Sequence, residues 1–359
     1  MSREKDMRIF LKSKFTLISF CFFSILNWSS FAWSLIWNIP IYGLSEIEVR
    51  AHAAKVVIKQ GDSSGTLKVS ILGGKEGLWR HEVQSILVSG GISNTSASGS
   101  ASSGSNLNSN ESLSKVLKIT GPEEGISIED TILSIELPPG APSSKFAFEE
   151  VRAELQGVSK LTLSALKGKI TGKNTGEGIK YFMQKGDIQS TKHTGTLEIE
   201  SFGGKISISE SQGATKIKLF SGDLVLEKNT GALSIESYSS SAKISDHQGN
   251  VNLQWGKGNL VINEFAGRLE GTSADGQLQI QLKTDSLIDL NAIRGKVSVK
   301  LPASSGASLN LKSVSGELIL PGTLKPTREG RFRVVHSKLP GTQKGSVAIH
   351  SDEASIVIR

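Results

Sequence analysis

Glycine recurs at every ninth position through the middle of this 359-residue chain. Ser240 stands in the one place where the series lacks a glycine, and the others are Gly186, Gly195, Gly204, Gly213, Gly222, Gly231, Gly249, Gly258, Gly267 and Gly276. Each nine-residue unit is numbered from its glycine, or from Ser240, as position one. Positions three and five are then mostly apolar, and position six is always polar. Apolar residues two apart predict a short strand with one buried face. Glycine predicts the turn between strands because it adopts positive φ without a Cβ clash.

The constant unit length decides between two architectures. Strands at this spacing fit an antiparallel sandwich or a β-solenoid. Hairpin loops vary in length, whereas stacked coils must match in length to keep their register. The period runs from Gly186 to Gln281 with no insertion or deletion. The predicted fold is therefore all-β. It is a β-solenoid of nine-residue strand-turn units, two per coil, preceded by a β-rich N-terminal cap.

A second period of 18 residues supports two units per coil. Position eight is aromatic in alternate units, at Phe202, Phe220 and Tyr238, and polar in the units between, including His193 and His247. Stacked coils would place the three rings about 4.8 Å apart. We expect the rings to fill a corner of the core, with an aromatic strip that binds sugar as the alternative.

The N-terminus predicts an export signal over residues 1–32. A basic start is followed by the apolar run Phe15–Leu26 and then by the small residues Ser30 and Ala32, and cleavage is expected after Ala32. An uncleaved membrane anchor is the alternative. Cys21 is the only cysteine and lies inside this segment. The mature chain would then contain neither a disulfide nor a thiolate metal site.

The composition indicates a β-rich, turn-rich chain, with 38 glycines and 6% aromatic residues. The predicted domain division gives residues 33–149 to a β-rich N-terminal region and residues 150–359 to the solenoid. A Ser/Gly/Asn-rich stretch, residues 89–112, is nearly uncharged and poor in apolar residues. We therefore expect it to be a disordered surface loop.

Several stretches resemble a known family. They are "GTLEIESFGGKISIS", "SGDLVLEKNTGALSIES" and "ASLNLKSVSGELIL". They are similar to the bacterial putative-adhesin family with a domain of unknown function, whose members repeat a V-x-G-D-I-x-V rhythm in a β-solenoid. The resemblance covers residues 45–359 and implies the same fold. The family has no established catalytic residues to carry over, and fold alone does not give function.

The pattern argues against several kinds of chemical site. The repeats lack the aspartates of a calcium-binding nonapeptide roll, and the acidic residues are too scattered for a polysaccharide lyase or hydrolase. His193 and His247 lie three coils apart, about 14 Å at the usual strand spacing, which is too far to share a metal. We expect surface polar roles for the histidines. No catalytic, cofactor-binding or metal-binding residue is predicted, and no cofactor.

The leading functional hypothesis is a non-enzymatic, exported envelope protein, either an adhesin-like binding module or a structural rod. The alternatives are a carbohydrate-active β-helix enzyme and a membrane-anchored envelope scaffold. The expected location is the periplasm, the cell surface or the medium. The net charge is +7, and +4 without residues 1–32. Outward positions carry no stripe of one sign, so we expect neither nucleic-acid binding nor strong binding to anionic lipid. The expected partners are envelope polysaccharide, peptidoglycan or surface proteins.

Overall fold

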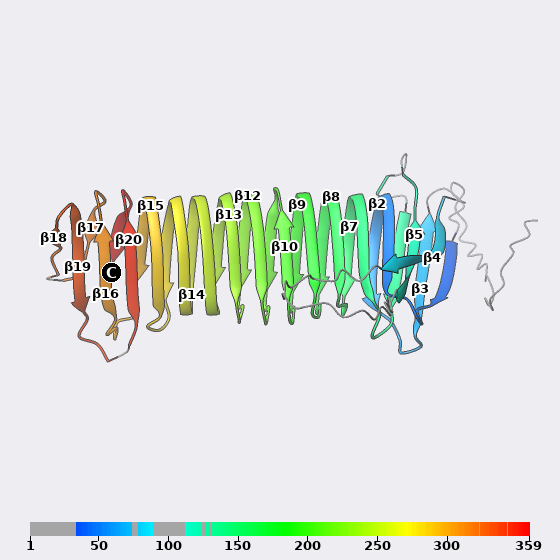
Figure 1. The fold of residues 1–359 in the computed structure, drawn as a ribbon, viewed down its shortest axis with the longest axis horizontal. Helices are drawn as coiled ribbons and strands as arrows, with labels where there is room; N and C mark the ends of the chain where they lie inside the picture. Colours follow the sequence, from blue (N-terminus) through cyan, green and yellow to red (C-terminus); the bar gives the residue numbers. More distant parts are fainter. Residues whose placement is uncertain are drawn as a thin grey trace, which may run out of the picture.

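The computed structural model describes residues 34–73, 78–88, 112–123, 127–128, 131–322, 324–342 and 344–359. These residues form a long rod built of 21 strands, without helices (Figure 1). The predicted all-β solenoid fold is thus confirmed. The predicted signal at residues 1–32 and all but Ser112 of the predicted loop at residues 89–112 lie outside the described residues.

The centre of the rod is a stack of parallel strands. These are β7 (Ser143–Gln156), β8 (Leu161–Lys173), β9 (Ile179–Thr191), β10 (Leu197–Ser201), β11 (Lys205–Ser209), β12 (Thr215–Glu227), β13 (Leu233–Ser245), β14 (Gln248–Leu282) and β15 (Leu287–Lys300). Most of these pairs join residues 18 apart, so that Thr215 pairs with Leu233, and Leu233 with Val251. Each coil contributes to two walls. The first wall contains Leu197, Thr215 and Leu233, and the second contains Leu224 and Ala242.

Alternation along each strand builds the core. Ile217 and Ile235 are buried at position five, whereas Lys216 and Glu236 on the same wall face solvent. Residues in register lie on successive coils, so the buried side chains of the two walls form one continuous hydrophobic core. Burial of each isoleucine contributes about 1.5–3 kcal/mol relative to an exposed one.

The glycine at position one marks a corner where successive coils come very close. Gly222 has a φ of 126°, and a Cβ built there would lie 2.1 Å from the carbonyl oxygen of Gly204 on the preceding coil. No side chain fits that gap without moving the backbone. The positive φ and the close approach therefore favour glycine at this corner, and Ser240, in register on the next coil, has no positive φ.

At the end of the second-wall strands, a left-handed residue and not a glycine turns the chain. The residue at position seven there has a left-handed backbone, with φ between 51° and 56°, at Asn174, Lys192, Glu210, Lys228, Asp246 and Glu264. Positions six and seven consequently both face outward, and position eight faces the interior. On the first wall, position seven is not left-handed and is buried, as at Leu219, so position eight points into solvent.

An N-terminal cap covers one end of the rod. Its strands are β1 (Ser34–Pro40), β2 (Glu46–Gln60), β3 (Thr66–Gly73), β4 (Arg80–Val88), β5 (Ser112–Thr120) and β6 (Thr131–Leu137). The pairs β1–β3, β3–β6 and β4–β5 are antiparallel. β2 pairs in parallel with β5, β6 and β7 and so joins the cap to the central stack. The domain division after residue 149 stays a prediction, and β7 runs across that position.

The C-terminal strands stack out of chain order. They are β16 (Ser308–Ser313), β17 (Leu318–Ile319), β18 (Thr327–Glu329), β19 (Phe332–Lys338), β20 (Ser346–Ser351) and β21 (Ser355–Ile358). β20 pairs in parallel with β15 on one side and with β16 on the other. β19 then pairs antiparallel with β16, and β18 with β19. The last segment of the chain thus lies between β15 and β16, and an irregular pair closes the stack.

Candidate binding face

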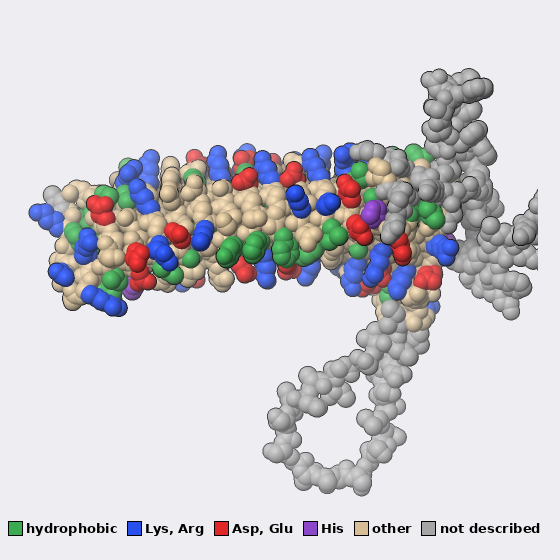
Figure 2. Space-filling model, turned by 90° about the horizontal axis from the view of Figure 1, so that it is seen from above, with side chains coloured by type: hydrophobic (Ala, Val, Ile, Leu, Met, Phe, Trp, Pro, Cys, Tyr) green, Lys and Arg blue, Asp and Glu red, His purple; other side chains and the backbone are tan. Residues whose placement is uncertain are grey.

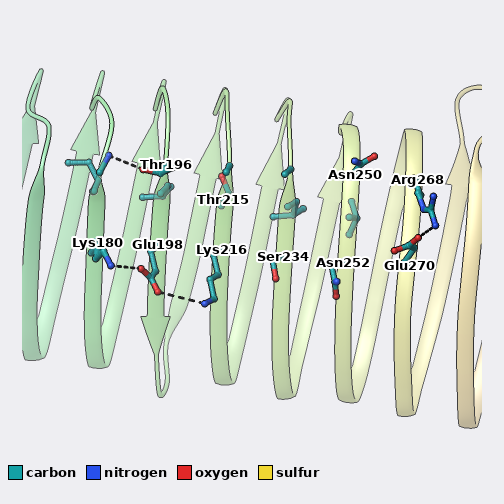
Figure 3. A pocket seen from close by; sticks show the side chains of 17 residues that line it. Lys180, Thr196, Glu198, Thr215, Lys216, Ser234, Asn250, Asn252, Arg268 and Glu270 are labelled. Atoms are coloured by element: carbon teal, nitrogen blue, oxygen red, sulfur yellow. Dashed lines mark hydrogen bonds and ion pairs between the residues drawn. The ribbon is translucent and has the colours of Figure 1, made fainter. Parts of the chain in front are cut away.

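A shallow groove of about 760 Å³ crosses six coils on the outer surface of the first wall (Figure 3). Its floor is formed by Ile179, Leu197, Thr215, Leu233 and Val251, and its sides and ends by Gly178, Lys180, Thr196, Glu198, Ala214, Lys216, Ala232, Ser234, Asn250, Asn252, Arg268 and Glu270. The coils that line it run from β9 to β14. The groove therefore follows the long axis of the rod.

Small side chains at position two produce the hollow. Successive coils place Gly178, Thr196, Ala214 and Ala232 in this column, and larger residues return with Asn250. The neighbouring column at position four carries longer side chains and forms a raised edge. The groove thus results from the difference in side-chain size between two columns, on a backbone that repeats regularly.

The raised edge alternates in charge at one end and is uncharged in its middle. The Lys180 Nζ lies 2.8 Å from Glu198 Oε2, and the Lys216 Nζ lies 4.0 Å from Glu198 Oε1 (Figure 3). The hydrogen bond from Lys180 lowers the pKa of Glu198. Ser234 and Asn252 follow on the next two coils. This part of the edge offers hydroxyl and amide groups to a partner.

An exposed row of aromatic side chains, the outer ladder, runs beside this face and consists of Phe202, Phe220 and Tyr238. Their exposed fractions are 47%, 54% and 60%. The ring centroids of Phe202 and Phe220 lie 6.3 Å apart, and those of Phe220 and Tyr238 lie 4.9 Å apart and nearly parallel. Figure 2 shows hydrophobic side chains in a row along the rod. The prediction that these rings fill a corner of the core was therefore wrong, because at this corner position eight points outward.

The alternative prediction for these rings was a strip that binds sugar, and the way the rings stack makes this role less favourable. Phe220 and Tyr238 lie face to face at an interplanar angle of 7°. The π face of Phe220 toward Tyr238 is thus covered, and the ring edges point to solvent. The ladder offers a partner mainly ring edges and apolar surface. This arrangement suits contact with other hydrophobic side chains better than a row of rings lying flat on sugars.

The other position-eight column, the inner column, consists of His193, Ser211, Asn229, His247 and Phe265. All five are buried, with exposed fractions of 0–5%. The surface role expected for His193 and His247 was therefore wrong. The left-handed residue before each of them directs position eight into the core. The sequence signal was present, since aromatic and polar residues alternate at position eight, but it did not reveal which set is inside.

Burial determines the protonation of the two histidines. His193 Nδ1 lies 2.9 Å from Thr175 Oγ1, and burial lowers the pKa of His193. Burial lowers the pKa of His247 to about 4, and a loose approach to the backbone of Asn229 opposes only part of that shift. Neither ring nitrogen of His247 makes a well-formed hydrogen bond. Both histidines are therefore neutral at pH 7.

The carboxylates of the groove are too far apart for paired acid/base chemistry. Glu198 and Glu270 lie four coils apart, roughly 19 Å at the usual strand spacing. Glycosidases need two carboxyl groups within roughly 5–9.5 Å. Among the described residues, no group of three or more His, Cys, Asp or Glu side chains is placed to hold a metal ion.

In the described part of the chain, no helix is long and apolar enough to cross a membrane. A family model described as Toastrack DUF4097 matches residues 44–358. That range is nearly the one over which the sequence resembles the adhesin-like family, and the match confirms the resemblance. A solved structure titled as a putative cell adhesion protein from Clostridium sporogenes is 10% identical, with a TM-score of 0.23, and the likeness covers 91% of this chain and 98% of that one. No curated protein matches this chain.

Proposed function

Since the chain belongs to the Toastrack DUF4097 family, we propose that it is a non-enzymatic, adhesin-like binding module of the cell envelope. Residues 1–32 would direct its export, and the rod would hold an extended polymer along its first wall. The polymer would be envelope polysaccharide or the glycan strand of peptidoglycan. The alternative partner is a surface protein.

One observation carries this proposal, namely the groove that continues over six coils. A groove with a repeating edge suits a partner that itself repeats, because many weak contacts then add along its length. Ser234, Asn250 and Asn252 supply hydroxyl and amide groups in a part of the groove without charges. Such groups match the hydroxyl and amide groups of a glycan.

The proposal is tested by co-sedimentation of the purified protein with peptidoglycan sacculi and with purified envelope polysaccharide. Ala232→Arg places a long side chain in the groove and should weaken binding at least about tenfold. Ser241→Arg is the matched control, because Ser241 is exposed at the same repeat position on the second wall. Equal binding by the two variants would place the partner elsewhere.

The same assay separates the other functional hypotheses. Retention of a surface protein, with no retention of glycan, would favour the protein partner. Release of sugar fragments that stops after Glu198→Gln or Glu270→Gln would establish a carbohydrate-active enzyme instead. Determination of the N-terminal residue of the protein from envelope fractions tests export, since cleavage after Ala32 leaves Trp33 as the first residue.

A further inference from the structure

Two neighbouring coils of the first wall carry opposite charges at matching positions. One coil presents Glu198 and Glu200, and the next presents Lys216 and Lys218. All four side chains are on the outer surface and at least partly exposed. Glu200 forms no ion pair within 4 Å among the described residues. These coils thus place an acidic pair beside a basic pair on the same flat face.

We propose that a second copy of this chain docks on this face in the antiparallel direction. The two-fold axis lies in the plane of the interface, perpendicular to the rod, between the Glu198 and Lys216 coils. Rotation about such an axis keeps each column opposite the same column of the second copy and reverses the order of the coils. Glu198 then faces Lys216 of the second copy, and Glu200 faces Lys218, each contact occurring twice.

Other positions of the axis are less favourable. An axis on the Glu198 coil places Glu198 opposite itself, and an axis on the next coil does the same for Lys216. Opposed like charges are repulsive and suppress such pairings. An axis one coil nearer the N-terminus pairs Lys180 with Glu198 but leaves Lys216 and Lys218 opposite Thr162 and Ser164, which carry no charge. Charge thus selects the axis between the acidic and the basic coil.

The match extends beyond the central coils. Lys145 and Glu270 meet across the same axis, and no like-charged pair arises at positions four and six over residues 145–272. Eight coils of about 4.8 Å and a strand width of about 20 Å give roughly 770 Å² for each copy. That area is about what a stable interface of standard size buries on each partner.

The same axis accounts for the outer ladder. Phe202 of one copy meets Phe220 of the other, so that rings about half exposed in the single chain become covered. Exposed hydrophobic rows of this kind mark contact sites. The small residues Thr196 and Ala214 also face one another across the axis, so the grooves of the two copies meet there. The docking therefore goes beyond the proposed function and does not depend on it.

A charge-swap experiment tests the docking with the full chain in a mild detergent, by sedimentation velocity. The wild-type chain should dimerise, more strongly at low salt. The acid-to-base variant E198K/E200K and the base-to-acid variant K216E/K218E should each self-associate at least about tenfold more weakly. Mixed in equal amounts, the two variants should form a dimer, because every swapped contact is then attractive again. The variant with all four swaps should dimerise by itself.

K205E/K243E is the control, because it changes exposed lysines of the second wall and should leave the dimer intact. Circular dichroism establishes that each variant folds, and E198Q/E200Q replaces an acid-to-base variant that does not. A wild-type chain that stays monomeric up to about 100 µM would overturn the proposal. A dimer that survives either swap, or that mixing fails to restore, would overturn the axis. Glycan binding that persists when Glu200→Lys or Lys218→Glu, both outside the groove lining, weakens the dimer leaves the proposed function standing.

Discussion

The two position-eight columns occupy the same place in alternate nine-residue units and have opposite environments. The outer ladder leaves Phe202, Phe220 and Tyr238 exposed, whereas the inner column buries His193 and His247. Hydrophobicity alone would predict the reverse. The backbone decides, because the left-handed residue before each inner-column side chain turns that side chain inward. The burial of a repeat position therefore depends on which corner it follows.

The largest expected effect comes from exchanging the two corners. Deletion of residues 222–230 removes one unit, so every later unit changes walls, which brings Tyr238 to the inner corner and moves His247 to the outer one. We expect loss of cooperative folding. Deletion of residues 222–239 removes one whole coil and keeps the corners in phase, so the rod should fold with one coil fewer. Thermal unfolding followed by circular dichroism measures both, and equal damage would contradict a coil of two units.

The second largest effect is expected when one residue of each column is replaced by lysine. Asn229→Lys introduces an unpaired charge at a site that is 5% exposed, where Asn229 Oδ1 accepts the Ser211 N–H. It should destabilise the fold by about 3 kcal/mol or more. Phe220→Lys lies on the outer ladder and should cost about 1 kcal/mol, mainly from lost ring contacts. Denaturant unfolding measures the difference, and similar losses would show that both columns are equally buried.

The regular strands of this fold could be predicted from the sequence, whereas the conformation of the left-handed corners could not. Apolar residues such as Leu233 and Ile235, two apart in most units, require a buried face, and the constant unit length requires stacked coils. The corners depend on left-handed residues such as Lys192 and Lys228, whose residue types do not mark that conformation. The groove has a visible sequence basis in the small residues at position two. Only the register shows that they form one column.

The C-terminal end shows a second limit. Apolar and polar residues alternate along β16 and β20, as in the strands of the central stack. Nothing in the pattern states that β20 lies between β15 and β16, because any parallel edge with exposed backbone groups can accept any such strand. The order of the stack is a long-range choice, fixed by which faces and ends fit together. Local periodicity carries no information about it.

His247, a buried histidine of the inner column, should make the stability of the fold depend on pH. The pKa of His247 is about 4 in the folded chain, against 6.5 for an ordinary histidine. Between these values the unfolded chain binds a proton that the folded chain does not, so stability is full above pH 6.5 and falls as the pH falls toward 4. The loss should reach about 3 kcal/mol. His247→Asn should remove that part of the pH dependence.

The control is His336→Asn, because His336 is exposed on β19. Unfolding free energies at pH 7 and pH 4.5 measure the change in both variants. Only the difference from the wild-type chain is compared, since carboxyl groups also titrate in this range. An unchanged pH slope in His247→Asn would show that this imidazole is not buried in its neutral form.

The smallest effect concerns the residues that direct the inner column. A left-handed backbone costs an ordinary L-residue about 1–2 kcal/mol, and asparagine tolerates it better. Lys228→Asn should therefore stabilise the rod by about 0.5 kcal/mol, measured as a rise in denaturation midpoint. Lys218→Asn on the first wall should do the opposite, because that strand position is extended and Lys218 lies 3.7 Å from Glu236. Changes of the same sign at both sites would mean that the left-handed corner carries no strain, and the explanation of the two columns would then rest on packing alone.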